Sequence, residues 1–199
     1  QFASSAASDV YKRQGYNYPD DSNVVSRFLA PGYVLASLGI DYKPVDYFSL
    51  YVSPATGKFT FVNKQELADA GAYGVEPAVV DTNGVIIESG KKSRAEFGAY
   101  LNAQFQKDIF KNVNLSVKLD LFNNYTDKNK ANRKYVDVNW ETALNLKINE
   151  YLTTSLLLHL IYDHDIEIPI DEDDDGIPEK MEPRVQFKEV FGLALSYKF

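Results

Sequence analysis

The chain has 199 residues, with 21 Lys and Arg against 28 Asp and Glu, which gives a net charge of −7. An acidic chain is a poor match for nucleic acid, because phosphate contacts need clustered basic residues. The absence of cysteine excludes disulfides, thiolate metal sites and a cysteine nucleophile. No apolar run approaches the ~18 residues that a membrane-spanning helix requires.

Residues 1–14, QFASSAASDVYKRQ, are small, polar and aperiodic. They lack a basic segment followed by an apolar one, so they do not read as a signal peptide. The part SDVYKRQ resembles translated sequencing-adapter read-through, and a natural disordered tail is the alternative. We therefore expect the fold to lie in residues 15–199.

The dominant hydrophobic period after residue 15 is two. Apolar side chains alternate with Asn, Ser, Lys, Asp and Gln over many consecutive positions, which is typical of strands with one apolar and one polar face. In the last predicted strand, Val185–Phe199, Glu189 is the one charge on the apolar face. The predicted strands are Tyr33–Lys43, Phe48–Pro54, Phe97–Gln106, Val113–Phe122, Val136–Ile148, Leu152–Asp163 and Val185–Phe199.

The connections between these strands alternate in length. Short ones are expected around 43–47, 107–112 and 149–151, and long ones over 55–93, 123–134 and 164–184. Such alternation is typical of an up-and-down meander and of transmembrane barrels, which have short turns at one rim and long loops at the other.

The longest connection has predicted structure of its own. Asn63 and Glu66 form a plausible capping pair for a short helix through Ala70, with Gly71 as its stop. Asn83-Gly84 lies between two aliphatic runs and predicts a hairpin with a type I′ turn.

Three features favour a membrane barrel over a soluble sheet. Most strands reach the ~9–11 residues that a tilted membrane strand needs, and the polar face carries the residue types of a wetted lumen. Aromatic residues also gather near both strand ends, as interfacial girdles do. They are Tyr42, Phe48, Phe105, Phe110, Tyr151, Tyr197 and Phe199 near the short turns, and Phe97, Tyr135, Tyr162 and Phe187 near the long loops.

The chain ends in FGLALSYKF, with Phe199 last and Leu193, Leu195 and Tyr197 in phase with it. This ending resembles the C-terminal signal of Gram-negative outer-membrane barrels, whose terminal aromatic residue is read by the insertion machinery. An edge strand that happens to end in Phe is the alternative.

Longer segments carry a closer resemblance. They are SRFLAPGYVLASLGIDYKP, FSLYVSPATGKFTFV, GAYGV, VNWETALNLKINEYL, LIYDHD and VQFKEVFGLALSYKF. Together they resemble a family of Bacteroidota outer-membrane β-barrels known only as a domain of unknown function. The resemblance covers nearly everything after Gly15 and implies a secreted, barrel-forming protein with a cleaved signal peptide. Its motifs are structural, so it implies no catalytic residue.

We therefore expect an all-β fold: an up-and-down antiparallel barrel of outer-membrane type, open, with about seven long strands. Single-chain bacterial barrels have even strand numbers, so seven strands indicate a truncated barrel, of which residues 15–199 are the C-terminal portion. We therefore expect a curled sheet or a gapped barrel with Tyr33–Lys43 as an unpaired edge. Residues 24–28 could be a fragment of a further strand.

The acidic segment after Ile170 matches the twelve-residue calcium-loop pattern. Asp171, Asp173 and Asp175 occupy its first three carboxylate positions, Gly176 allows its turn, and Glu182 occupies its last position. Strands rather than helices flank it, and Pro178 is unusual there. Ca²⁺ is thus a possible ligand, and a solvated acidic loop is the alternative.

Other polar residues offer less. His159 and Asp163 lie on one polar strand face, with His164 just beyond, where a metal or acid–base role is conceivable but lumen lining is commoner. Inward-facing Asp41, Lys118, Asp120, Asp137, Glu141 and Lys147 predict a charge ladder, or less often a selective pore. No nucleophile or phosphate-loop motif appears, so we do not expect an enzyme.

The sequence thus predicts an outer-membrane β-barrel with a structural or passive channel role. The alternative is a soluble β-barrel that binds a small apolar ligand inside. The side of the sheet on which Val117, Leu144, Leu158 and Leu193 lie distinguishes the two.

Overall fold

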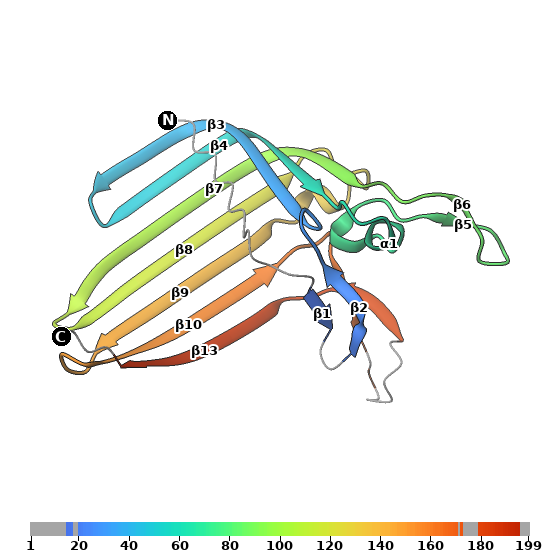
Figure 1. The fold of residues 1–199 in the computed structure, drawn as a ribbon. Coiled ribbons are helices and arrows are strands. Elements are labelled where there is room, and N and C mark those ends of the chain that lie inside the picture. Colours follow the sequence, from blue (N-terminus) through green and yellow to red (C-terminus); the bar gives the residue numbers. More distant parts are fainter. Residues whose placement is uncertain (1–14, 18–19, 171, 173–178, 196–199) are drawn as a thin grey trace. The chain divides into compact units, whose positions relative to one another are not determined.

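The computed structural model describes residues 15–17, 20–170, 172 and 179–195. Its main element is an antiparallel sheet of seven strands that follow one another in chain order (Figure 1). The strands are β3 (Gly32–Val45), β4 (Phe48–Phe61), β7 (Ser93–Phe110), β8 (Val113–Asn124), β9 (Asp137–Lys147), β10 (Leu152–Tyr162) and β13 (Gln186–Leu195). The prediction of an all-β, up-and-down sheet with about seven long strands is confirmed.

The sheet is open, with β3 at one edge and β13 at the other. The predicted edge strand, Tyr33–Lys43, is therefore confirmed. Residues 24–28 do not extend the sheet, because β2 (Asp20–Ser26) pairs with β1 (Gly15–Asn17) in a separate two-stranded sheet. Another two-stranded sheet joins β11 (Glu167–Ile170) to β12 (Lys180–Pro183).

Strand β4 continues beyond Pro54, where the sequence predicts a long loop to begin. Ser53 is buried, and its hydroxyl donates to the carbonyl oxygens of Leu38 at 2.8 Å and Ala55 at 3.0 Å. Further along, Thr56 and Thr60 are buried while Phe59 and Phe61 are exposed. Burial thus passes from odd to even positions, a one-residue change of phase of the kind a β-bulge produces. This change hides the strand from a search for strict alternation.

The chain divides into two compact units, residues 1–37 with 56–97, and residues 38–55 with 98–199. The first contains the long segment between β4 and β7, with α1 (Gln65–Asp69), the 3₁₀ turn η1 (Ala72–Gly74), and a hairpin of β5 (Val79–Val80) and β6 (Ile86–Glu88). Its small core consists of Ala30, Val62, Ala68 and Val75.

The predicted helix and its glycine stop are present, but the predicted capping pair is wrong. Lys64 is the N-cap and makes no side-chain capping bond. Asn63 instead donates its backbone N–H to the Leu29 carbonyl oxygen at 2.8 Å. Gly71 follows the helix with φ +70°, a conformation that favours glycine.

The predicted hairpin at Asn83-Gly84 is present, but its type I′ turn is wrong. That turn needs positive φ at both central residues, and only Gly84 has it, at +80°. The Asp81 carboxylate accepts the backbone N–H groups of Asn83 and Val85, each at 2.8 Å. An aspartate-led turn therefore replaces the predicted one, because this side chain satisfies two backbone donors.

Within the first unit, Glu96 is a buried carboxylate with two cationic neighbours. Its side chain is 2% exposed, and Arg94 Nη2 lies 2.9 Å from Oε1 while Lys58 Nζ lies 3.8 Å from Oε2. Arg94 also donates through Nη1 to the Gly74 carbonyl oxygen at 3.3 Å. These contacts join the ends of β4 and β7 to the segment between them.

Candidate functional site

The candidate site is the polar face of the sheet in the second unit. The strand register places polar side chains in one row across five neighbouring strands. Because paired residues of neighbouring strands project to the same side, these side chains are neighbours across the strands. The row consists of Gln104 on β7, Lys118 on β8, Glu141 on β9, His159 on β10 and Lys188 on β13.

Asp120 collects several contacts beside this row. Its Oδ1 accepts from the Tyr100 hydroxyl and from Asn102 Nδ2, the latter at 2.7 Å, and its Oδ2 lies 3.1 Å from Lys118 Nζ. Gln104 extends the chain of contacts by donating to Asn102 Oδ1 at 2.8 Å. Such a network fixes side chains on neighbouring strands relative to one another.

His159 lies in the same row and has two neighbours on β9. Its Nε2 is 2.7 Å from Asn139 Oδ1 and 3.7 Å from Glu141 Oε1. Asp163, which the sequence places on this face, accepts the Asp165 backbone N–H at 2.9 Å. The described residues contain no group of three or more His, Cys, Asp and Glu that could hold a metal ion.

His164 lies apart from the row, at the long-loop end of β10. Its ring stacks on Tyr135 with centroids 3.8 Å apart, and its Nδ1 lies 3.0 Å from the Tyr162 hydroxyl. Asp137 Oδ1 accepts the His164 backbone N–H at 3.4 Å. The contacts of His164 are those of a loop anchor.

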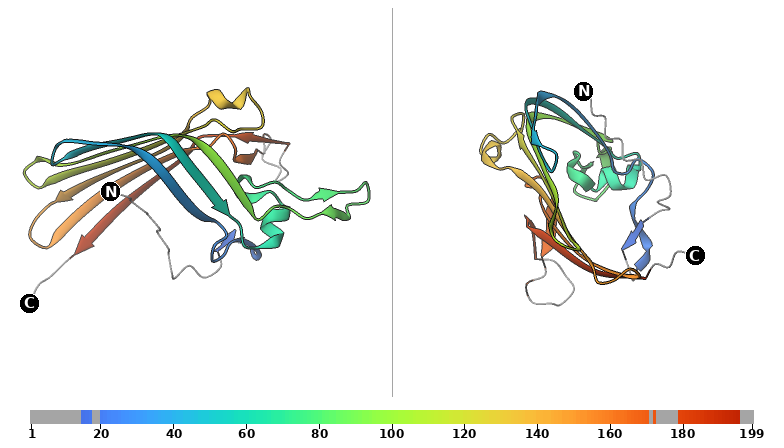
Figure 2. Two further views of the ribbon diagram at one scale, coloured as in Figure 1. Left: turned by 90° about the horizontal axis from the view of Figure 1, so that it is seen from above. Right: turned by 90° about the vertical axis from the view of Figure 1, so that its left-hand side faces the viewer.

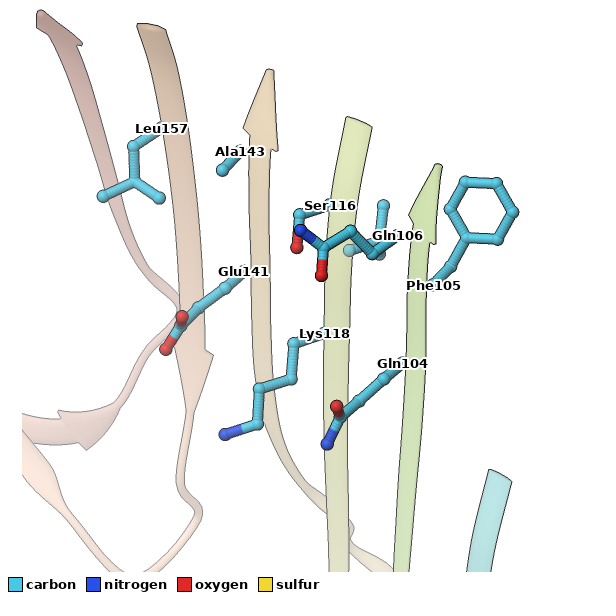
Figure 3. Close-up of a pocket in the computed structure, with 9 residues that line it drawn as sticks. Gln104, Phe105, Gln106, Ser116, Lys118, Glu141, Ala143 and Leu157 are labelled. Atoms are coloured by element: carbon cyan, nitrogen blue, oxygen red, sulfur yellow. The ribbon is translucent and has the colours of Figure 1, made fainter. Parts of the chain in front are cut away.

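A shallow pocket opens on the polar face (Figure 3). The side chains of Gln104, Lys118 and Glu141 point to one side of the sheet there, whereas Phe105 points to the other. The pocket therefore presents amides and both signs of charge. Its lining consists of Gln104, Phe105, Gln106, Ser116, Val117, Lys118, Glu141, Ala143 and Leu157.

On the opposite face, the edge strands β3 and β13 expose their apolar side chains, whereas most of those on the central strands β8–β10 are half-buried. Leu38 is 75% exposed, Phe191 72% and Leu195 80%. The four residues that distinguish a membrane barrel from a soluble one lie on this apolar face. Leu193 is exposed, and Val117, Leu144 and Leu158 are half-buried. Buried apolar side chains among the described residues are few: Ala30, Val62, Ala68, Val75, Phe122 and Ile170.

The possible calcium site falls mostly outside the described residues, as Asp171, Asp173 and Asp175 do. Glu182 is described on β12, with Oε1 3.6 Å from Lys180 Nζ. Lys180 also pairs with Glu172 Oε1 at 2.5 Å, and this hydrogen bond and charge lower the pKa of Glu172. Calcium binding stays a prediction, in which Ca²⁺ competes with Lys180 for Glu182. Phe199, the predicted recognition residue, also lies outside the described residues.

Two features of the site were not predictable from alternation alone. The sequence places Lys118, Asp120 and Glu141 on the polar face, but their partners depend on the strand register. The sequence predicts a loop from Asn123 on, whereas Asn123 lies within β8, and its side chain donates to the backbone of the next loop. The sequence signal for this contact is that the Asn123 amide is in phase with Leu119 and Leu121, on the apolar side of the strand.

Comparison with known proteins gives no relative from which to transfer a function. No protein-family model, curated protein or solved structure matches this chain. Among the described residues, no helix has the length and apolar character needed to cross a membrane.

Proposed function

We propose that this chain forms part of an outer-membrane β-barrel of a Gram-negative bacterium, with a structural or passive channel role. The observation that carries the proposal is the division of the sheet into two faces. Apolar side chains lie on one face, exposed on the edge strands and half-buried on the central ones, while amides and charges gather around a pocket on the other. Lipid against the first face and water against the second satisfy both.

Strand length supports the same conclusion. The seven strands have between 10 residues, in β13, and 18 residues, in β7. A tilted strand crosses the hydrocarbon layer with ~9–11 residues, whereas strands of globular proteins most often have ~5–6. Every strand of the main sheet is thus long enough to span.

Exposed aromatic residues near both strand ends add support. Phe59 and Phe61 end β4 beside its long loop, and Tyr42 and Phe110 lie near short turns. Aromatic side chains favour the two interfaces of a membrane. We expect the two groups to mark the two interfaces.

A membrane barrel must also be closed, because bare backbone groups in hydrocarbon cost several kcal/mol each. In an antiparallel sheet of seven strands, the first and last run in the same direction. Antiparallel closure between β3 and β13 therefore needs an odd number of further strands. Lipid and the barrel-insertion machinery are the expected partners.

Trp140 allows a direct test, since it is the only tryptophan of the chain and is 40% exposed. It pairs with Leu119 and Leu160 and lies on the apolar face. In vesicles of brominated phosphatidylcholine, we expect strong quenching of its fluorescence and a blue shift. Aqueous iodide should quench it little.

A matched variant moves the reporter to the other face. In Trp140→Phe combined with Ser116→Trp, the tryptophan faces the pocket, and we expect iodide quenching without bromine quenching. If bromine spares Trp140 in protein that has folded with vesicles present, the membrane proposal is wrong. The soluble β-barrel with an apolar interior would then be the better description.

A further inference from the structure

The loop between β8 and β9, residues 125–136, differs in charge from the rest of the chain. It carries Lys128, Lys130, Arg133 and Lys134 but a single acid, Asp127, whereas the whole chain has a net charge of −7. All four basic residues are exposed. The loop is therefore a basic patch on an acidic protein.

Hydrogen bonds within the loop order its backbone. Asp127 Oδ1 accepts the Asn129 backbone N–H at 2.7 Å, and Asn129 Oδ1 accepts that of Ala131 at 3.1 Å. The Arg133 guanidinium donates through Nε and Nη2 to the Asp127 carbonyl oxygen at 3.0 and 2.9 Å. The 3₁₀ turn η2 (Asn132–Lys134) follows. These bonds hold the basic side chains on one short, ordered segment.

Asn123 ties this segment to the apolar side of the sheet. It pairs with Ala99, and its side chain is in phase with Leu119 and Leu121 on the apolar face. Its Nδ2 donates to the carbonyl oxygens of Arg133 at 2.9 Å and Tyr135 at 2.7 Å. The loop thus turns toward the face proposed to meet lipid, and Figure 2 shows it standing out to one side of the strands.

Aromatic rings accompany the basic residues. Tyr125 and Tyr135 are exposed at the two ends of the loop, and Lys134 Nζ lies 5.0 Å from the centroid of the Tyr135 ring. Tyrosine favours the headgroup level of a membrane, and basic side chains there attract anionic headgroups. The two residue types together fit the surface of a membrane better than bulk water.

We propose that the β8–β9 loop binds the phosphate headgroups of anionic lipid in the membrane leaflet at the long-loop end of the barrel. This inference rests on the proposed membrane location. Lys128, Lys130, Arg133 and Lys134 supply the positive charge, and Tyr125 and Tyr135 sit beside them at the interface. Neighbouring lipid is then selected by headgroup charge.

Trp140 reports on this binding, because it lies three residues into β9, close to the loop. The experiment uses vesicles of brominated phosphatidylcholine to which unbrominated phosphatidylglycerol or unbrominated phosphatidylcholine is added. Phosphatidylglycerol that binds the loop displaces brominated lipid and relieves the quenching. We expect it to act at a concentration about tenfold lower than phosphatidylcholine at low salt, since each basic residue near the surface adds attraction that salt screens.

Two variants of equal charge make the test specific. Replacing the four basic loop residues by Gln should abolish the preference for phosphatidylglycerol. The matched control replaces the exposed Lys43, Lys107, Lys111 and Lys147 by Gln at the short-turn end, and should keep the preference. If the ligand is lipid, inorganic phosphate should compete with phosphatidylglycerol no better than sulfate does at the same ionic strength.

The outcomes separate the two proposals. If brominated lipid does not quench Trp140 in the unmodified chain, the membrane location fails. If quenching occurs but both lipids relieve it equally, or both variants lose the preference alike, the loop is not the binding surface and this inference is overturned. If inorganic phosphate competes with phosphatidylglycerol better than sulfate does, the loop binds a free anion rather than lipid, and this inference is also overturned.

Discussion

The small core around α1 and the apolar face of the sheet expose their aliphatic side chains to opposite degrees. Val62 and Ala68 are fully buried, whereas Leu38 and Leu195, on the two edge strands, are 75% and 80% exposed. The same kind of side chain thus meets protein in one region and the surroundings in the other. No residue among those described fully covers this face, whose side chains are exposed at the sheet edges and half-buried on the central strands, so we expect an apolar solvent against it.

The largest expected effect tests the apolar face. Leu156 and Leu157 are adjacent on β10, and Leu156 pairs with Leu144 and Phe191 on that face. Leu156→Arg should cost about 2–4 kcal/mol of folding free energy in vesicles, since an arginine near the bilayer centre is poorly solvated. Denaturant titration of vesicle-folded protein measures it.

Leu157→Arg is the matched control, because Leu157 lines the pocket on the polar face. This change should cost much less than Leu156→Arg. Equal costs for the two substitutions would remove the distinction between a lipid face and a wet face.

A smaller effect tests the packed core. A Cβ at Gly90 would lie 2.2 Å from the Ala68 carbonyl oxygen and 2.8 Å from Asp69 Cα, both backbone atoms. Gly90→Ala should destabilise this unit by about 1–3 kcal/mol, as other overpacking changes do. Faster hydrogen exchange of the Ala68 and Ala78 amides would report it.

Gly57→Ala is the control in the same unit, since its nearest atom is Phe59 Cε2, a side-chain atom at 3.2 Å. We expect little change there. If both variants speed exchange equally, the close approach at Gly90 is not what holds the segment.

The smallest effect concerns pH and the β5–β6 hairpin. Backbone N–H groups of Val85 and Asn83 bind the Asp81 carboxylate and lower its pKa below the ordinary 3.8. A lowered folded-state pKa means that the stabilisation is complete above the ordinary value and is lost as pH falls through the lower one. Amide chemical shifts of Asn83 and Val85 should follow this loss below about pH 4.

Asp81→Ala should remove that pH dependence while leaving the shifts of the main sheet unchanged. A hairpin whose shifts titrate identically in the variant would show that another group is responsible.

The fold was largely predictable, because strict alternation is a direct consequence of two-faced strands. The prediction failed at Ser53 and Pro54, where the change of phase ended the visible alternation although the strand continued. It also failed at Asn63, whose backbone is used by Leu29, a partner 34 positions away that no local motif reveals. Capping and turn rules use only residues that are close along the chain. Here the predicted bonds were replaced by a distant backbone bond at Asn63 and by side-chain bonds at Asp81.

The site was predictable in composition but not in contacts. Alternation placed Lys118, Asp120 and Glu141 on one face. The row from Gln104 to Lys188 and the pairing of His159 with Asn139 follow from register, which hairpin length and bulges set and composition does not. The Glu96 cluster was not predicted, because Lys58 lies on the part of β4 after Pro54, and Arg94 and Glu96 lie on the part of β7 before Phe97.

The two edges of the sheet have a practical consequence for anyone preparing this chain. Strands β3 and β13 each present a long row of backbone donors and acceptors at the edge. Such edges are templates for pairing between molecules, and β3 of one copy could pair antiparallel with β3 of another. We therefore expect the chain in isolation to aggregate edge to edge. Detergent that covers only the apolar face would leave these edges free. The fraction of aggregated protein should therefore rise with the concentration of the chain.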